Sequence, residues 1–212
     1  MSQSDLRKQN IQLVVEKALG CFIEQGIDKT KVSQIAERAG LTERSVFRYF
    51  KTKTDLVLAA SYLYWDNVME YIEKKHPPEE REGMTGLEEI GELLICYSEL
   101  YLDDPKGIRF TLDAELMLQA AGKNDVHRNQ PPEPYESSNG QVARAIRKGL
   151  KDGSIPPGVD VKELYYNSYD SILGIMQRLS IGGTPSGGEL DYRKRMESIS
   201  RMFVRAFSDC RV

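Results

Sequence analysis

Hydrophobic side chains recur along most of the chain at the three- and four-residue spacing of an amphipathic helix. The first run extends from Ile11 to Ile23 and ends at Gly26, a residue type that commonly terminates helices. No segment alternates hydrophobic and polar residues convincingly enough to suggest a strand. The pattern predicts an all-α protein of about nine helices, over approximately 11–25, 30–39, 42–50, 53–75, 85–102, 105–121, 141–152, 160–181 and 189–208. Residues 122–135 and the glycine-rich stretch 182–188 read as loops.

Two of the short predicted helices are joined by a turn with helix-turn-helix spacing, Gly40-Leu41-Thr42. Gly40 can adopt the positive φ angle that a sharp turn requires. Small Ala36 and Ala39 allow the two helices to approach closely. We expect residues 1–53 to form an N-terminal three-helix domain that carries this helix-turn-helix, and residues 54–212 to form a larger helical domain.

The helix after Thr42 should turn Val46 toward the core, with Phe50 beside it on the same side. At about 100° per residue, Arg44 and Arg48 then point almost directly away from it. Guanidinium groups suit bidentate contacts with guanine edges and phosphates. Thr42 and Ser45 lie near the helix start, where hydroxyls bind phosphate, and Lys51 and Lys53 could reach the flanking backbone. A plain helical hairpin with solvated arginines has the same turn, so the pattern alone leaves both interpretations open.

Charge and composition narrow the function further. The net charge is −3, but residues 1–53 carry +4 and the remainder −7, which favours an anionic partner at one end. No apolar run is long enough for a membrane span. Three scattered cysteines, Cys21, Cys96 and Cys210, suggest neither a metal site nor a disulfide framework. We expect a cytoplasmic protein that is not an enzyme and needs no cofactor or metal, because no catalytic or phosphate-loop pattern is present.

The stretch from Val32 to Leu56 resembles the signature of the tetracycline-repressor-like (TetR) family of transcriptional regulators. The matching residues are Ile35, Ala36, Ala39, Gly40, Leu41, Thr42, Ser45, Val46, Phe47, Tyr49, Phe50, Thr52, Lys53 and Leu56. The resemblance implies DNA-contact roles for Thr42, Ser45, Arg48, Tyr49 and Lys53. Phe47 departs from the tyrosine that the family usually has there. The candidate DNA-binding set is completed by Arg44, Phe47, Lys51 and Thr30, which is also the expected N-cap of the second helix.

The resemblance also implies a homodimer, assembled through C-terminal helices and bound to a palindromic operator in double-stranded DNA. The helices at 160–181 and 189–208 carry hydrophobic residues on more than one face, as expected of helices with two neighbours. The candidate dimer residues are Leu164, Ile172, Ile175, Leu179, Met196, Ile199, Phe203 and Phe207. A monomeric core built from the same helices is the alternative.

By the same resemblance, a small-molecule pocket is expected inside the helices from about 85 to 180. Its candidate lining residues are Trp65, Met69, Cys96, Tyr97, Tyr101, Phe110, Met117, Tyr166, Tyr169, Asp170 and Met176. The acids Asp170 and Glu115 would suit a cationic ligand. For each residue alone, ordinary core packing is the more common role of such a side chain. The leading hypothesis is a repressor released from DNA by a ligand. The alternatives are a family member controlled by a protein partner or by nothing, and a helical enzyme.

Overall fold

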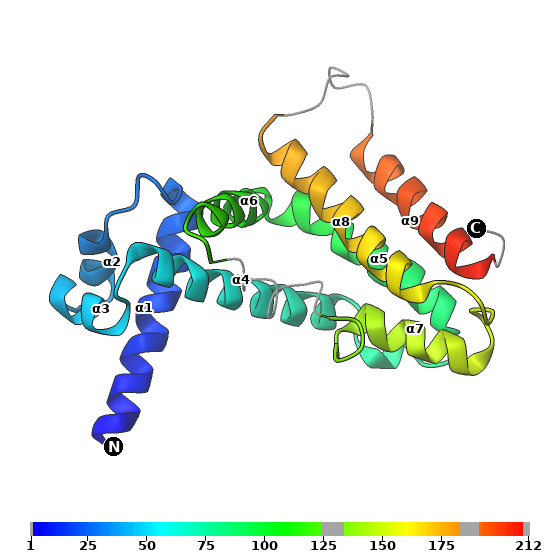
Figure 1. Ribbon diagram of the computed structural model, residues 1–212, viewed down its shortest axis with the longest axis horizontal. Helices are drawn as coiled ribbons and strands as arrows, with labels where there is room; N and C mark the ends of the chain where they lie inside the picture. Colours follow the sequence, from blue (N-terminus) through cyan, green and yellow to red (C-terminus); the bar gives the residue numbers. More distant parts are fainter. Residues whose placement is uncertain (1, 124–133, 183–190, 210–212) are drawn as a thin grey trace. The chain divides into compact units, whose positions relative to one another are not determined.

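The computed structural model describes residues 2–123, 134–182 and 191–209. Over these residues the chain forms nine α-helices and one 3₁₀ helix, and no strand (Figure 1). The predicted all-α fold is therefore confirmed. Most of the predicted loop at 122–135 and of the link at 182–188 lies outside the described residues. The elements are α1 (Gln3–Gln25), α2 (Val32–Arg38), α3 (Glu43–Tyr49), α4 (Lys53–Lys75), η1 (Pro78–Arg81), α5 (Gly86–Asp103), α6 (Pro105–Ala120), α7 (Gln141–Asp152), α8 (Val161–Ser180) and α9 (Tyr192–Ser208).

The helix ends follow local capping as well as periodicity. Helix α1 begins at Gln3, two turns before the hydrophobic pattern becomes regular at Ile11. Ser2 and Asp5 form a reciprocal capping box there, in which each side chain accepts a hydrogen bond from the other's backbone nitrogen. The polar start of the chain is thus helical because of this capping, which the spacing of hydrophobic residues does not predict.

The chain forms two compact units. The first comprises Met1–Asn67 and Lys106–Gln130, and the second Val68–Pro105 and Pro131–Val212. Helix α4 contributes its first part to one unit and its last turns to the other. This division by packing differs from the functional division at residues 53 and 54, which stays a prediction.

Unit 1 is held together by a core that includes aromatic residues from three helices. Phe22 of α1 stacks on Phe110 of α6 with ring centroids 6.1 Å apart. Tyr64 of α4 meets both Phe110 and Trp65 edge-on. Aromatic pairs of this geometry add to the stabilisation from area burial alone. Phe110 and Trp65, which were expected to line a ligand pocket, are core residues of unit 1.

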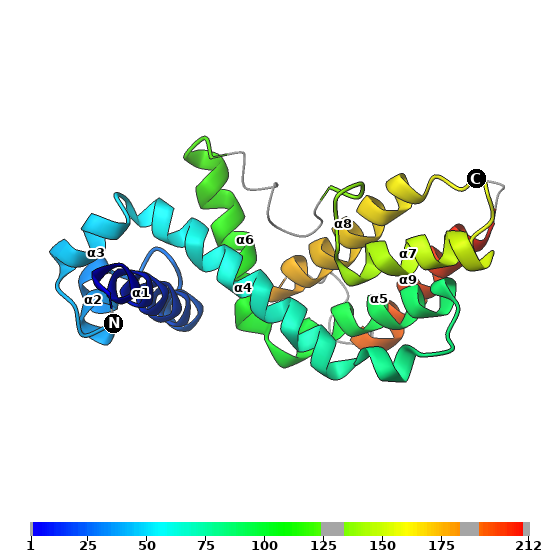
Figure 2. The ribbon, with the colours of Figure 1, turned by 90° about the horizontal axis from the view of Figure 1, so that it is seen from below.

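Unit 2 is a bundle in which α5 packs against α7, α8 and α9 (Figures 1 and 2). Its closest approach lies where α5 starts beside α7: a Cβ added at Gly86 would lie 2.0 Å from the backbone nitrogen of Gly149. Only glycine allows that contact. Lys75 near the end of α4 bonds to Glu99 of α5, and Arg193 of α9 bonds to the same carboxylate.

Candidate DNA interface

The helix-turn-helix is built around Gly40, which has a φ of 65°. That left-handed conformation lets the backbone nitrogen of Leu41 donate to the Ala36 carbonyl at 2.9 Å and closes the end of α2. Helix α3 then starts at Glu43, because the Thr42 hydroxyl accepts a hydrogen bond from the Ser45 backbone nitrogen at 3.2 Å. The predicted turn and cap are both present.

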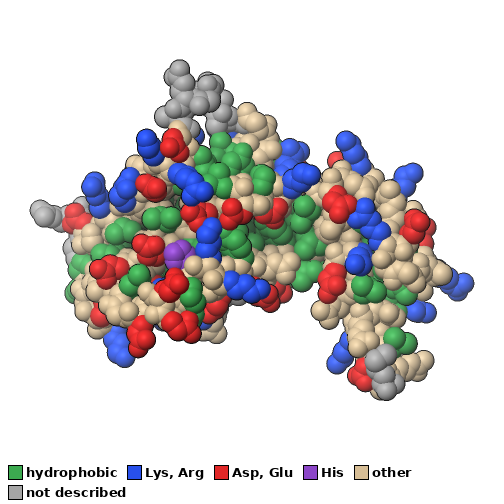
Figure 3. All heavy atoms as spheres, turned by 180° about the vertical axis from the view of Figure 1, so that it is seen from behind, with side chains coloured by type: hydrophobic (Ala, Val, Ile, Leu, Met, Phe, Trp, Pro, Cys, Tyr) green, Lys and Arg blue, Asp and Glu red, His purple; other side chains and the backbone are tan. Residues whose placement is uncertain are grey.

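Helix α3 buries Val46, leaves Ser45 and Tyr49 half-buried, and exposes its other side chains. Val46 is 1% exposed, whereas Arg44, Phe47 and Arg48 are all exposed. The predicted outward direction of the two arginines therefore agrees with the structure. Lys and Arg side chains project from the surface of this unit (Figure 3). A solvent-facing helix with two guanidinium groups one turn apart can offer bidentate donors to a polyanion.

Tyr49 ends α3 in a cationic setting. The Arg48 guanidinium donates to the Tyr49 hydroxyl at 3.3 Å and lies 5.3 Å from the centre of the ring. Hydrogen bonds from Arg48 and from Asn10 of α1 lower the pKa of the Tyr49 hydroxyl. Sequence reasoning did not identify Asn10, because only the folded chain brings α1 to the end of α3.

The start of α4 is fixed by a second capping box and by a lysine just beyond the end of α6. Thr52 donates from its backbone nitrogen to the Asp55 carboxylate at 2.9 Å, and the Asp55 backbone nitrogen donates to the Thr52 hydroxyl at 3.1 Å. Lys123 also bonds to Asp55. Lys51 is exposed, whereas Lys53 is half-buried and reaches the Asp28 carbonyl at 3.5 Å. Burial lowers the pKa of Lys53.

Thr30 has a structural role instead of the predicted surface role. It is 1% exposed, and its hydroxyl donates to the carbonyls of Gly26 at 2.8 Å and Cys21 at 3.2 Å. The N-cap of α2 is Lys31, not Thr30. The Thr30 hydroxyl thus satisfies the backbone after α1 and has no path to a DNA surface, so its assignment as a DNA contact was wrong.

The comparisons with known proteins agree with this geometry. Residues 14–60 match the family model described as bacterial regulatory proteins, tetR family. A fatty acid metabolism regulator protein of Bacillus subtilis is 22% identical over 149 residues, which is 70% of this chain and 72% of that protein. The chain belongs to the TetR family of transcriptional regulators. The matched segment contains all of α2 and α3, so the DNA-binding element of this TetR-family protein is the one that Gly40 and Val46 organise.

Solved structures support the fold of the TetR-family chain. A TetR-family regulator from Rhodococcus sp. superposes with a TM-score of 0.67 at 16% identity, covering 93% of this chain and 99% of that one. A regulator from Bacillus subtilis in complex with stearoyl-CoA superposes with a TM-score of 0.58 at 16% identity, covering 92% and 98%. At these identities the likeness concerns architecture alone.

Within unit 2, several of the candidate ligand residues of the TetR-family protein form a tyrosine cluster. The Tyr97 and Tyr169 hydroxyls lie 3.2 Å apart, and the Tyr97 hydroxyl donates to the Met69 sulfur at 3.2 Å. Cys96 and Met176 are buried, and burial raises the pKa of the Cys96 thiol to about 11. The backbone nitrogen of Tyr135 donates to the Tyr166 hydroxyl at 3.2 Å. These groups form a packed cluster of mostly apolar side chains with a few hydroxyls.

The remaining candidates for the ligand site are placed elsewhere. Tyr101 packs on Tyr192 with ring centroids 5.1 Å apart. Asp170 is exposed on α8 and therefore does not line an enclosed space. Met117 belongs to unit 1, where it lines a pocket of about 650 Å³ beside the end of α1. Sequence periodicity placed these residues on hydrophobic helices but did not separate the two units.

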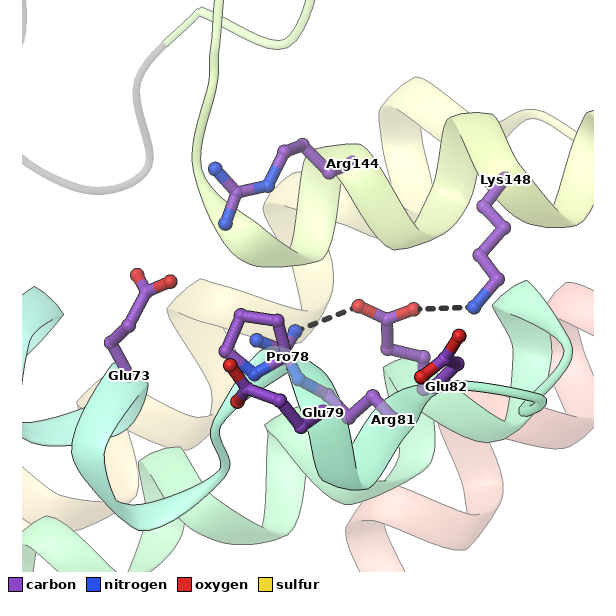
Figure 4. A pocket seen from close by; sticks show the side chains of 8 residues that line it. Glu73, Pro78, Glu79, Arg81, Glu82, Arg144 and Lys148 are labelled. Carbon is purple, nitrogen blue, oxygen red and sulfur yellow. Dashed lines mark hydrogen bonds and ion pairs between the residues drawn. The ribbon is translucent and has the colours of Figure 1, made fainter.

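A charged pocket of about 580 Å³ in unit 2 was missed by sequence reasoning (Figure 4). Arg81 of η1 lies in a run of charged residues, yet it is 5% exposed and bonds to Glu89 of α5 at 2.7 Å. Lys148 of α7 bonds to the other Glu89 oxygen at 3.0 Å. A buried charge requires such partners, and here they come from helices far apart in the sequence.

Three predicted dimer residues are instead core residues of unit 2. Ile172 is 3% exposed, Met196 1% and Phe207 0%. Packing within one chain already covers these side chains, so their assignment to a partner-facing surface was wrong. Leu164, Ile175, Leu179, Ile199 and Phe203 are half-buried. Among the described residues no helix is long and apolar enough to cross a membrane, and no cluster of side chains could hold a metal ion.

Replacing Asp55 by Asn tests the anchoring of α4. The hydrogen bonds from Lys123 and Thr52 lower the pKa of Asp55 in the folded protein. The ionised carboxylate therefore stabilises the fold fully above the ordinary carboxyl pKa of about 4. This stabilisation is lost as the pH falls through the lower pKa that Asp55 has in the folded state. We expect Asp55→Asn to lower the free energy of unfolding by about 1 kcal/mol at pH 7. Urea unfolding at pH 7 and at about pH 3 should show the difference shrinking in acid. A constant difference would contradict the proposed ionic anchor, and exposed Asp66→Asn is the control.

Proposed function

We propose that this TetR-family protein is a sequence-specific repressor that binds double-stranded DNA through α3 and is released when a small molecule binds unit 2. The observation that carries the DNA-binding half is the geometry of α3, in which Val46 alone is buried while Arg44 and Arg48 are exposed. The supporting comparison is the family match over residues 14–60. The protein would act in the cytoplasm, where DNA is accessible.

The exposed groups of α3 divide naturally between bases and phosphates. Arg44 and Arg48 suit guanine edges in the major groove, and the ring of Phe47, 42% exposed, suits the methyl group of thymine. Ser45, Tyr49 and Lys51 would contact backbone phosphates. The Thr42 hydroxyl lies 3.0 Å from that of Ser45 and would share such a contact. Lys53, already directed to the Asp28 carbonyl, would contribute mainly its charge.

We assign dimerisation to the exposed faces of α8 and α9. Met202 is 65% exposed, and Ile199 lies three residues before Met202 and four before Phe203, at helical spacing from both. On α8, Leu164, Ile175 and Leu179 are half-buried. A hydrophobic stripe that its own chain leaves uncovered is typical of an interface. Two copies would place two α3 helices about 34–36 Å apart, as required for successive major grooves of a palindromic operator.

The ligand half of the proposal is supported by the tyrosine cluster and by one relative. Tyr97, Tyr169 and Met69 supply mostly apolar surface with a few hydroxyls, the usual composition of small-molecule sites. A similar regulator has been solved with stearoyl-CoA. We therefore propose a ligand with a long apolar chain, of the acyl-CoA class. Exposed Asp170 gives no support to a cationic ligand, and control by a protein partner remains the alternative.

Arg48→Ala should weaken DNA binding without unfolding the protein. An operator is first selected from random duplexes by the unaltered protein, and binding is then measured by fluorescence anisotropy. We expect a loss of about 1–3 kcal/mol if Arg48 reads a base. Arg38→Ala is the matched control, since Arg38 is exposed on α2 and bonds to Glu24. Equal affinities for the Arg48 variant and the unaltered protein would contradict the assignment of α3.

Met202→Glu should produce monomers. A charge in the centre of a hydrophobic interface loses its hydration on association, which costs more than the interface gains. Sedimentation velocity at micromolar concentration is expected to show a dimer for the unaltered protein and a monomer for the variant. Leu150→Glu serves as the control because Leu150 of α7 is 43% exposed and lies outside the proposed stripe. If the unaltered protein sediments as a monomer, the dimer proposal is wrong.

Stearoyl-CoA should stabilise the protein and release it from the selected operator. A ligand at a concentration of about 100 times its Kd stabilises the folded state by about 2.7 kcal/mol, which corresponds to a rise of several degrees in Tm. Thermal unfolding with coenzyme A alone is the control for headgroup binding. If stearoyl-CoA leaves both the Tm and the DNA affinity unchanged, the acyl-CoA proposal is wrong and a protein partner becomes the leading alternative.

A further inference from the structure

The charged pocket of unit 2 differs in chemistry from the tyrosine cluster and shares no residue with it. Its walls come from the end of α4, from η1, from the start of α5 and from α7 (Figure 4). Four glutamates, two arginines, one lysine and one proline line it, and none of these side chains is aromatic. A volume of about 580 Å³ lies in the range of small-molecule sites.

One carboxylate at the pocket, that of Glu89, is already shared by two cations. Arg81 Nη1 donates to one of its oxygens at 2.7 Å, and Lys148 Nζ donates to the other at 3.0 Å. The Glu89 side chain is 11% exposed. These three groups together carry one positive charge, so the deep side of the pocket has an excess of hydrogen-bond donors.

Two buried polar atoms at this place have no hydrogen-bond partner within the part of the chain that the structure describes. They are Arg81 Nε, a donor, and Gln141 Oε1, an acceptor. Gln141 is 0% exposed and lies beside the pocket, because its Nε2 donates to the Glu73 carboxylate at 3.2 Å. A buried donor or acceptor costs free energy until it is paired. One unpaired group of each kind favours a ligand that both accepts and donates.

Charges at the mouth of the pocket also lack partners. Arg144 extends from α7, and Glu73 extends from the end of α4 toward the same space (Figure 4). Arg144, Glu79 and Glu82 are exposed and form no ion pair with any described residue. A guanidinium can give a carboxylate two parallel N–H donors, whereas ionised glutamates can only accept. The mouth thus offers both signs of charge.

We propose that the charged pocket binds a small molecule that carries a carboxylate and two cationic groups, of the class of basic α-amino acids. The ligand carboxylate would bind Arg144 and the unpaired Nε of Arg81. Its cationic groups would bind Glu73, Glu79 and Glu82. This second site does not depend on the proposed acyl-CoA site or on DNA binding.

The balance of charge selects this class over simple anions. The four glutamates and three cationic side chains of the lining give it a net charge of −1. A ligand of charge +1 neutralises that excess, whereas a dianion would bring its charge close to four carboxylates. A long acyl chain would meet charged walls, because proline is the one uncharged residue of the lining.

The test is isothermal titration calorimetry of the full chain at neutral pH with L-arginine and L-lysine as probes. A ligand of this size is expected to bind with a Kd of about 10 µM to 1 mM. Agmatine lacks the carboxylate of L-arginine, and L-citrulline lacks its side-chain charge. Each should bind at least about tenfold more weakly than L-arginine, because each loses one charge-assisted contact. Succinate, a dianion, should give no heat of binding.

Two pairs of variants locate the site. Arg144→Gln should weaken L-arginine binding about tenfold and bring its Kd close to that of agmatine. Its matched control is Lys151→Gln, which removes the same charge from the same helix outside the pocket. Glu79→Gln should weaken both ligands, and Glu80→Gln is its control within η1. Circular dichroism melts check that every variant is folded.

The outcomes separate this site from the proposed function. Absence of binding by both L-arginine and L-lysine at millimolar concentration overturns the proposal. Equal effects of the pocket variants and their controls also overturn it, as does succinate binding tighter than that of L-arginine. Neither DNA nor stearoyl-CoA is present in these titrations, so their failure leaves the proposed repressor function standing.

Discussion

The DNA-binding surface depends on the burial of one side chain, Val46. Helix α3 has seven residues, which is too few for a helix to be stable alone in water. Two contacts hold α3 in its helical conformation: the Val46 side chain is packed in the core at 1% exposure, and the Thr42 hydroxyl caps the first turn. Every outward group on α3 takes its direction from those two contacts. A substitution that removes the Val46 side chain would therefore disrupt the recognition surface without altering any residue that contacts DNA.

Local rules predicted the parts of the fold that local chemistry controls. Periodicity placed Val46 inside and Arg44 and Arg48 outside, and Gly40 adopts the positive φ that its place in the turn required. The helix ends at Asp152 and Lys75 also fell where glycine and proline follow them. The start of α1 was missed although its signal, Ser2 followed three residues later by Asp5, is present in the sequence.

The errors share a different cause: burial depends on neighbours that only the folded chain brings together. Thr30 has the hydroxyl of a surface contact, but carbonyls at Cys21 and Gly26 take both of its hydrogen bonds. Arg81 lies in a run of charged residues and is buried because Glu89 lies across from it. A hydrophobic residue on a two-faced helix, such as Ile172, gives no sign of which face its own chain will cover. Spacing predicts that two faces exist, and tertiary packing alone assigns them.

Packing also limits the routes by which a ligand in unit 2 could change DNA binding by unit 1. Among the described residues the chain passes between the two units at 67–68, within α4, and at 105–106, at the start of α6. A helix transmits displacement because its hydrogen bonds resist bending. In unit 1, Asp55 near the start of α4 is bonded to Lys123 just beyond α6, so these two helices are linked close to the end of α3. A ligand that binds unit 2 equally well in both states of α4 would shift nothing. The affinity difference must therefore arise at side chains whose position changes with α4 or α6.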